Sequence, residues 1–181
     1  MKKMILSVLL LGAATTVQAQ TAPPAPAQAA QPPACAAPES HQLDFWIGRW
    51  DVYPAKQPDK LVAHSLIESV YAGCAIRENW MPLANPGGGS LSAWVPGQKG
   101  WRQTWVDSSG AWVEFQGGMQ GNALVLEGEW GKRTRMRYEP LPDGSIRQSG
   151  EALGADGKWS PSFDLIYRRA KSPDLSGRGN R

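Results

Sequence analysis

Tryptophans and polar side chains alternate along several short segments of this sequence, and these residues are the best suited to hold a ligand. The chain has nine tryptophans. In an extended segment every second side chain points to the same face. Aromatic walls with a few polar groups are typical of small-molecule pockets. The candidate ligand-binding residues are the members of these shared faces: Glu78, Trp80, Trp101, Gln103, Trp105, Trp112, Glu114, Arg135 and Arg137.

Two interpretations of these faces stay open at the level of sequence. In the first, the tryptophans line an internal cavity, where the glutamates, Gln103 and an arginine orient a small amphipathic ligand. In the second, the tryptophans fill the interior and the charged residues form cross-strand pairs on a solvated outer face. The second interpretation is favoured for any single residue. The number of alternating segments favours a cavity for the domain as a whole.

Catalytic and metal-binding patterns are poorly represented. The two histidines, His41 and His64, do not stand in a ligand-spaced cluster, so we expect no metal and no cofactor. The sequence contains no nucleophile elbow, and the glycines of 86–89 do not open a helix as a phosphate-binding loop would. A non-enzymatic protein is therefore predicted. The weaker alternative is an enzyme in which aromatic walls raise the pKa of Glu78 or Glu114 for acid–base work.

Residues 1–19 have the pattern of a secretory signal peptide. Lys2 and Lys3 precede a short apolar run, and Val17-Gln18-Ala19 matches the small-x-small cleavage pattern. The alternative is an uncleaved anchor, but the apolar run is shorter than the roughly 20 residues that a spanning helix needs. We therefore expect a periplasmic or secreted protein without a transmembrane segment after cleavage.

The basic character of the chain belongs to its ends. The whole sequence carries a formal charge of +3, and loss of the two signal-peptide lysines lowers it to +1. Residues 168–181 hold five basic residues and one acid, which leaves −3 on the body of the chain. Such a body lacks the basic stripe that neutralises phosphates, so nucleic acid is not an expected partner.

The composition divides the remaining chain into three parts. Residues 20–38 contain six prolines and no hydrophobic residue larger than alanine apart from Cys35, which predicts a disordered linker. Residues 172–181 are polar and basic and are predicted to be a disordered tail. One β domain is expected over 39–171. Cys35 and Cys74 are the only cysteines, and in an exported chain they predict one disulfide, with two free thiols as the alternative.

Short alternating segments separated by Gly, Pro, Asp or Asn predict an all-β domain, with a single helical turn or plug over 39–45. Tight-turn sequences such as Pro142-Asp143-Gly144 join consecutive strands into a meander. Closure of about ten antiparallel strands into an up-and-down barrel removes the exposed edges, and a β-sandwich is the alternative. The predicted strands are 48–53, 61–71, 74–81, 90–95, 100–107, 112–117, 123–130, 133–139, 145–151 and 162–169.

Residues 43–52, LDFWIGRWDV, resemble the DFWxGxWxV opening of a family of uncharacterised bacterial exported proteins. Further pieces in the same order are similar to that family: Gly73-Cys74 with Glu78 and Trp80, residues 101–109, Arg147-Gln148 before Glu151, and residues 163–167. The resemblance covers most of 40–169. The Gly-x-Trp of the opening is also the mark of the wider lipocalin-like (calycin) superfamily.

The resemblance implies a lipocalin-like barrel in which Trp50 packs across the closed end, with Arg168 or Arg169 as its partner. Characterised barrels of this kind bind fatty acids, pigments or haem. The haem-binding members use a histidine late in the chain, and this sequence has none after His64. The resemblance thus implies a small, partly apolar ligand other than haem. The alternative is a non-enzymatic structural or interaction module of the cell envelope, whose basic tail contacts anionic partners.

Overall fold

The structure, a computed structural model, describes residues 35–171. Ten antiparallel strands dominate it, and each corresponds to one of the ten predicted segments. No strand end differs from the prediction by more than three residues. The strands are β1 (Gly48–Pro54), β2 (Ala63–Val70), β3 (Ala75–Pro82), β4 (Gly88–Val95), β5 (Gly100–Asp107), β6 (Trp112–Gln120), β7 (Ala123–Trp130), β8 (Lys132–Pro140), β9 (Ile146–Leu153) and β10 (Trp159–Arg169).

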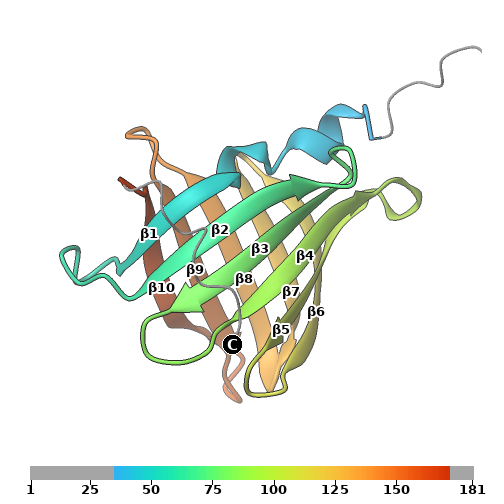
Figure 1. Cartoon of the computed structure of the whole chain (residues 1–181). Coiled ribbons are helices and arrows are strands. Elements are labelled where there is room, and N and C mark those ends of the chain that lie inside the picture. Colours follow the sequence, from blue (N-terminus) through green and yellow to red (C-terminus); the bar gives the residue numbers. More distant parts are fainter. Residues whose placement is uncertain (1–34, 172–181) are drawn as a thin grey trace, which may run out of the picture. The chain divides into compact units, whose positions relative to one another are not determined.

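Each strand pairs with its neighbours in the chain, and β1 pairs with β10 to close the barrel (Figure 1). In this closing ladder, Trp50 lies opposite Arg169 and Val52 lies opposite Tyr167. The predicted up-and-down barrel is confirmed, and the sandwich alternative is wrong. Closure pairs the outer edges of β1 and β10, which an open sheet of ten strands would leave unpaired.

The last strand begins earlier than the sequence predicts. The predicted strand begins at Ser162, directly after Pro161, which has no N–H to donate to a ladder. The structure instead starts it at Trp159, with a register shift between Pro161 and Phe163. A β-bulge accommodates the proline without ending the pairing.

One end of the barrel is covered by the segment that precedes β1. The short 3-10 helices η1 (Pro38–His41) and η2 (Asp44–Trp46) lie there, opposite the end that carries the β3–β4 loop (Figure 1). A third, η3 (Pro96–Gln98), joins β4 and β5. Leu43 and Trp46 are fully buried. The predicted plug over 39–45 is therefore confirmed, and it extends to Trp46.

Cys35 and Cys74 form the predicted disulfide. It ties the residues before η1 to the turn between β2 and β3. The predictions for residues 1–19, 20–34 and 172–181 lie outside the described residues. Within residues 35–171, no helix is long and apolar enough to cross a membrane.

Candidate functional site

Inward-facing positions on the strands are filled very unevenly along the barrel. Near η2 they carry large apolar side chains such as Trp101 and Leu124, both almost completely buried. Around Glu78 they include Ser65 and Ser90, which are also buried but much smaller. Small residues on the inner face leave room that the large side chains of the closed half do not fill.

Glycines on the inner face let two aromatic rings lie against the barrel wall. A Cβ at Gly150 would come within 2.2 Å of Cε1 of Phe163, and a Cβ at Gly88 within 2.9 Å of Cζ2 of Trp105. Contacts this short are not possible between real atoms, so each ring occupies the space that the Cβ of any residue other than glycine would take at position 88 or 150. With the rings held against the wall, the centre of the barrel stays open.

The space that remains is a cavity of about 170 Å³ inside the barrel. Its lining is mostly apolar, with a small group of polar side chains. The lining residues are Glu78, Trp80, Gln103, Trp105, Trp130, Met136, Tyr138, Gln148, Phe163, Leu165 and Tyr167.

Glu78, on β3, is the one carboxylate among these lining residues, and it is only 4% exposed. Its neighbours are a serine on each flanking strand. The Ser65 hydroxyl donates to Oε1 over 3.1 Å, and the Ser90 hydroxyl donates to Oε2 over 3.1 Å. Burial raises the pKa of Glu78 to about 7, and the two serine hydrogen bonds only partly oppose this effect. The carboxyl can therefore gain or lose a proton near neutral pH.

Two buried tyrosines and two glutamines stand beside Glu78 in the cavity wall. The Tyr138 hydroxyl donates to Oε1 of Gln103 over 3.1 Å, and the Tyr167 hydroxyl donates to Oε1 of Gln148. The amide of Gln103 in turn donates to Ser92 over 2.8 Å. Burial, and then the charge of Glu78, raise the pKa values of both tyrosines, so both phenols stay neutral in the physiological range.

The cavity is surrounded by aromatic rings toward the end opposite η2. Trp105 and Trp130 lie with ring centroids 6.0 Å apart, and Trp130 is 42% exposed, which places it at the mouth. Trp80 packs beside Tyr167 at a centroid distance of 6.1 Å. The indole N–H of Trp105 donates to Asp107 over 3.0 Å, so this ring presents mainly its apolar surface to the cavity.

Trp46 packs behind two of the residues that line the cavity, Tyr138 and Tyr167. Its ring packs 4.8 Å from that of Tyr138 and 6.3 Å from that of Tyr167, and Trp50 donates from Nε1 to its carbonyl oxygen over 2.8 Å. The Trp46 Nε1 is buried and has no hydrogen-bond partner among the described residues. The plug thus supports the two tyrosines from behind.

Four of the nine predicted ligand-binding residues line the cavity: Glu78, Trp80, Gln103 and Trp105. Trp101 faces inward as expected, but it packs in the closed half. There its indole N–H donates to Oε1 of Gln42 over 3.1 Å, away from the cavity.

The other four predicted residues lie on the outer face, so their expected position inside the barrel is wrong. Trp112 is 73% exposed and donates to Glu114 over 3.1 Å. Arg135 pairs with Glu151 at 2.7 Å, and Arg137 pairs with Glu139. Both strands that carry them present the alternate, less polar set inward: Val113 and Phe115 on β6, and Thr134, Met136 and Tyr138 on β8. The outer-face interpretation was correct at these positions.

Sequence reasoning missed several residues of the site, above all Tyr138, Gln148 and Tyr167. Tyr138 directly follows Arg137 on β8, so it lies on the opposite face from the arginines, and that face is the inner one. A comparison of the two faces of each strand by apolar content would have found it. Gln148 and Tyr167 carry no comparable signal, because their strands alternate weakly.

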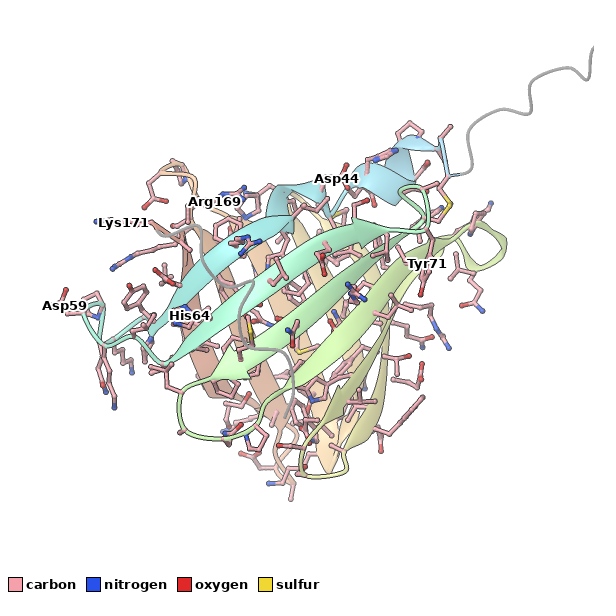
Figure 2. The ribbon with its side chains drawn as sticks, viewed as in Figure 1. Asp44, Asp59, His64, Tyr71, Arg169 and Lys171 are labelled. Atoms are coloured by element: carbon pink, nitrogen blue, oxygen red, sulfur yellow. A yellow bond between two sulfur atoms is a disulfide. The ribbon has the colours of Figure 1, made fainter. Side chains whose placement is uncertain are left out.

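The closed end distinguishes between the two arginines that the resemblance implied as partners of Trp50. Arg169, not Arg168, is the partner of Trp50. The Arg169 guanidinium lies 4.0 Å from the centre of the Trp50 ring and donates to the carbonyl oxygen of Ile47 over 2.8 Å. Figure 2 shows Arg169 at the same end of the barrel as Asp44 of η2. Arg168 faces the other way, because successive strand residues alternate, and it lies over Tyr53.

Among the described residues, no group of three or more His, Cys, Asp or Glu side chains is placed to hold a metal ion. Each histidine instead contacts one aspartate, His41 with Asp44 at 2.9 Å and His64 with Asp51 at 2.8 Å. No family model matches the chain, and neither does any curated protein.

Proposed function

We propose that this chain is an exported binding protein that takes up one small, partly apolar molecule inside its barrel. One observation carries the proposal. A mostly apolar cavity holds a cluster of buried polar groups around Glu78, with aromatic side chains toward its mouth. Binding sites for small molecules commonly combine these two features.

The volume of the cavity limits the size of the ligand. An engineered apolar cavity of 150 Å³ in another protein binds benzene. The present cavity, about 170 Å³, therefore suits a molecule near the size of one aromatic ring. Drug-sized ligands need roughly 300–1,000 Å³, so a fatty acid or a tetrapyrrole is a poor candidate.

Binding is a better proposal than catalysis for the same groups. An acid–base residue of the kind considered from the sequence must be a buried carboxylate beside a cavity. Glu78 meets this requirement, whereas Glu114 is not buried and does not line the cavity. The nearby hydroxyls of Ser65, Ser90, Tyr138 and Tyr167, however, all donate to side-chain oxygens. Ser65 and Ser90, the two hydroxyls that donate to the Glu78 carboxylate, are not among the described residues that line the cavity, so neither stands where a bound molecule would meet it as a nucleophile.

The test compares two leucine-to-tryptophan variants. Leu165 lines the cavity, and Leu91 is exposed on the outer face of β4. Binding of benzylamine, benzyl alcohol and benzoate is measured by calorimetry, and native mass spectrometry shows what the protein carries from the cells that make it. We expect one-to-one binding of at least one probe, lost in Leu165→Trp and kept in Leu91→Trp. Binding that survives in Leu165→Trp, or no binding of any probe, contradicts the proposal.

A further inference from the structure

We infer, on the basis of the proposed function, that the ligand is a small organic cation. An alkyl or aryl ammonium group would pair with the Glu78 carboxylate, and the apolar part of the ligand would lie among the aromatic rings of the cavity. Three features of the described residues support this inference: the lack of a positive partner for Glu78, the polarity of the groups around it, and the aromatic walls.

Glu78 has no positively charged partner in the cavity. None of the eleven described residues that line the cavity is Lys, Arg or His. Carboxylates on the outer face do have such partners, as in the pairs of Glu68 with Arg77 and of Glu127 with Arg133. A buried carboxylate without a counter-charge is costly. A cationic ligand would supply the missing charge and reduce that cost.

The hydrogen bonds already made by the cluster leave acceptors toward a ligand. Each carboxylate oxygen of Glu78 accepts one serine hydroxyl and keeps further lone-pair capacity. The phenol of Tyr167 uses its proton on the oxygen of Gln148, which leaves its own oxygen as an acceptor. An ammonium group has N–H donors and no acceptor, so it complements this arrangement. A carboxylate ligand would meet the negative charge of Glu78.

The walls also favour a cation. The face of an aromatic ring carries partial negative charge, and sites built from several such rings recognise ammonium groups. Trp80, Trp105 and Trp130 line the cavity from three different strands, and Phe163 adds a fourth ring. A neutral apolar ligand would also pack against these rings, but it would gain nothing from Glu78.

The inference predicts that binding depends on pH. The titratable or hydroxyl groups that face Glu78 are Ser65 and Ser90 on the flanking strands and Tyr138 and Tyr167 across the cavity. Only Glu78 changes charge near neutral pH, since its pKa is about 7 and the pKa values of both phenols are raised. Ammonium binding favours the carboxylate and releases its proton. Affinity should therefore rise from pH 5.5 to pH 8.

The experiment measures the affinity of benzylamine, benzyl alcohol and benzoate by calorimetry at pH 5.5 and pH 8. These probes share one ring and differ in charge. At pH 8 we expect benzylamine to bind at least about tenfold more tightly than benzyl alcohol, and benzoate to bind most weakly. The preference for benzylamine should shrink at pH 5.5. It should disappear in Glu78→Gln and persist in Glu114→Gln, whose site lies on the outer face.

The outcomes distinguish a failure of the cation inference from a failure of the proposed binding function. If benzyl alcohol or benzoate binds as tightly as benzylamine, or if Glu78→Gln keeps the preference, the inference is wrong while the proposed function stands. If none of the probes binds, both are wrong. Trp130→Leu is a second variant, because it removes a ring at the mouth and leaves Glu78 intact. It should weaken benzylamine binding more than benzyl alcohol binding, and an equal effect on both counts against the inference.

Discussion

The hydroxyl of Ser65 donates a hydrogen bond of 3.1 Å to Oε1 of Glu78, across the β2–β3 pair and inside the barrel. Ser90 makes the equivalent contact from β4. The two serines hold the carboxyl in one orientation but do not compensate for its removal from water, and the pKa of Glu78 stays raised.

The ligand-free barrel should become less stable as pH rises toward neutrality. The pKa of Glu78 is about 7 in the folded chain, against an ordinary value of 4.5, so the folded state binds more protons between these values. The stabilisation that Glu78 adds to the free energy of unfolding is fully present below about pH 4.5 and is lost as pH rises through about 7. The loss is on the order of 3 kcal/mol. Urea unfolding of the parent chain and of Glu78→Gln at pH 5 and pH 8 measures it.

Glu78→Gln should lose this pH dependence, because an amide does not titrate. At pH 8 it should be more stable than the parent chain. Glu114→Gln is the control, and it should keep the parent's slope because Glu114 is exposed. Equal slopes in the parent chain and in Glu78→Gln would mean that Glu78 is not a buried group of raised pKa.

Gly150→Ala should reduce the cavity. Its new methyl group would collide with the Phe163 ring and push the ring toward the centre of the barrel. We expect a stability loss of about 1–3 kcal/mol and weaker binding of benzylamine. Gly118→Ala is the matched control, since nothing lies within 4 Å of a Cβ there. Calorimetry and urea unfolding report both effects, and identical behaviour of the two variants would show that Phe163 does not depend on Gly150.

Arg169→Ala should destabilise the closed end of the barrel. The substitution removes both the contact of the guanidinium with Trp50 and its hydrogen bond to Ile47, together about 1–2 kcal/mol. Arg168→Ala should cost less than about 1 kcal/mol, because Arg168 contacts Tyr53 and the carbonyl of Pro58 on the outer surface. Urea unfolding ranks the two. A larger loss in Arg168→Ala would contradict the assignment of Arg169 as the partner of Trp50.

Reduction of the disulfide should lower the free energy of unfolding substantially. Cys35 and Cys74 are 39 residues apart, and in the chain-entropy model a loop of this length contributes about 4 kcal/mol. Thermal unfolding with and without dithiothreitol measures the effect. With and without dithiothreitol, the Cys35→Ser/Cys74→Ser double variant should unfold at the same temperature as the reduced parent chain. A parent chain whose unfolding temperature does not change with dithiothreitol would contradict the expectation.

The sequence predicted the fold well because strand alternation and turn chemistry act locally. Pro142-Asp143-Gly144 and the other turn sequences define where each strand ends, and ten strands in a meander leave closure as the way to pair their edges. The start of β10 was missed because Pro161 is tolerated only through a bulge, which depends on the partner strand β9. That information is not present in the segment itself.

The candidate site was predicted only in part, because an alternating strand has two faces and the sequence does not say which one lies inside. On β3 and β5 the tryptophans and polar groups share the inner face, so Glu78, Trp80, Gln103 and Trp105 were found. On β6 an exposed tryptophan, Trp112, has the same appearance in sequence. Which face is buried depends on the register of all ten strands, and this register is a property of the closed barrel.

The most direct test of the account follows the Glu78 carboxyl itself. The ¹³C chemical shift of this carboxyl, assigned by comparison with Glu78→Gln, is recorded against pH with and without saturating benzylamine. We predict a midpoint at about 7 for the free protein, lowered by at least about one pH unit when the ammonium is bound. A midpoint that stays the same with bound benzylamine, or one that already lies near the ordinary glutamate value in the free protein, would contradict a cation held against a buried carboxylate.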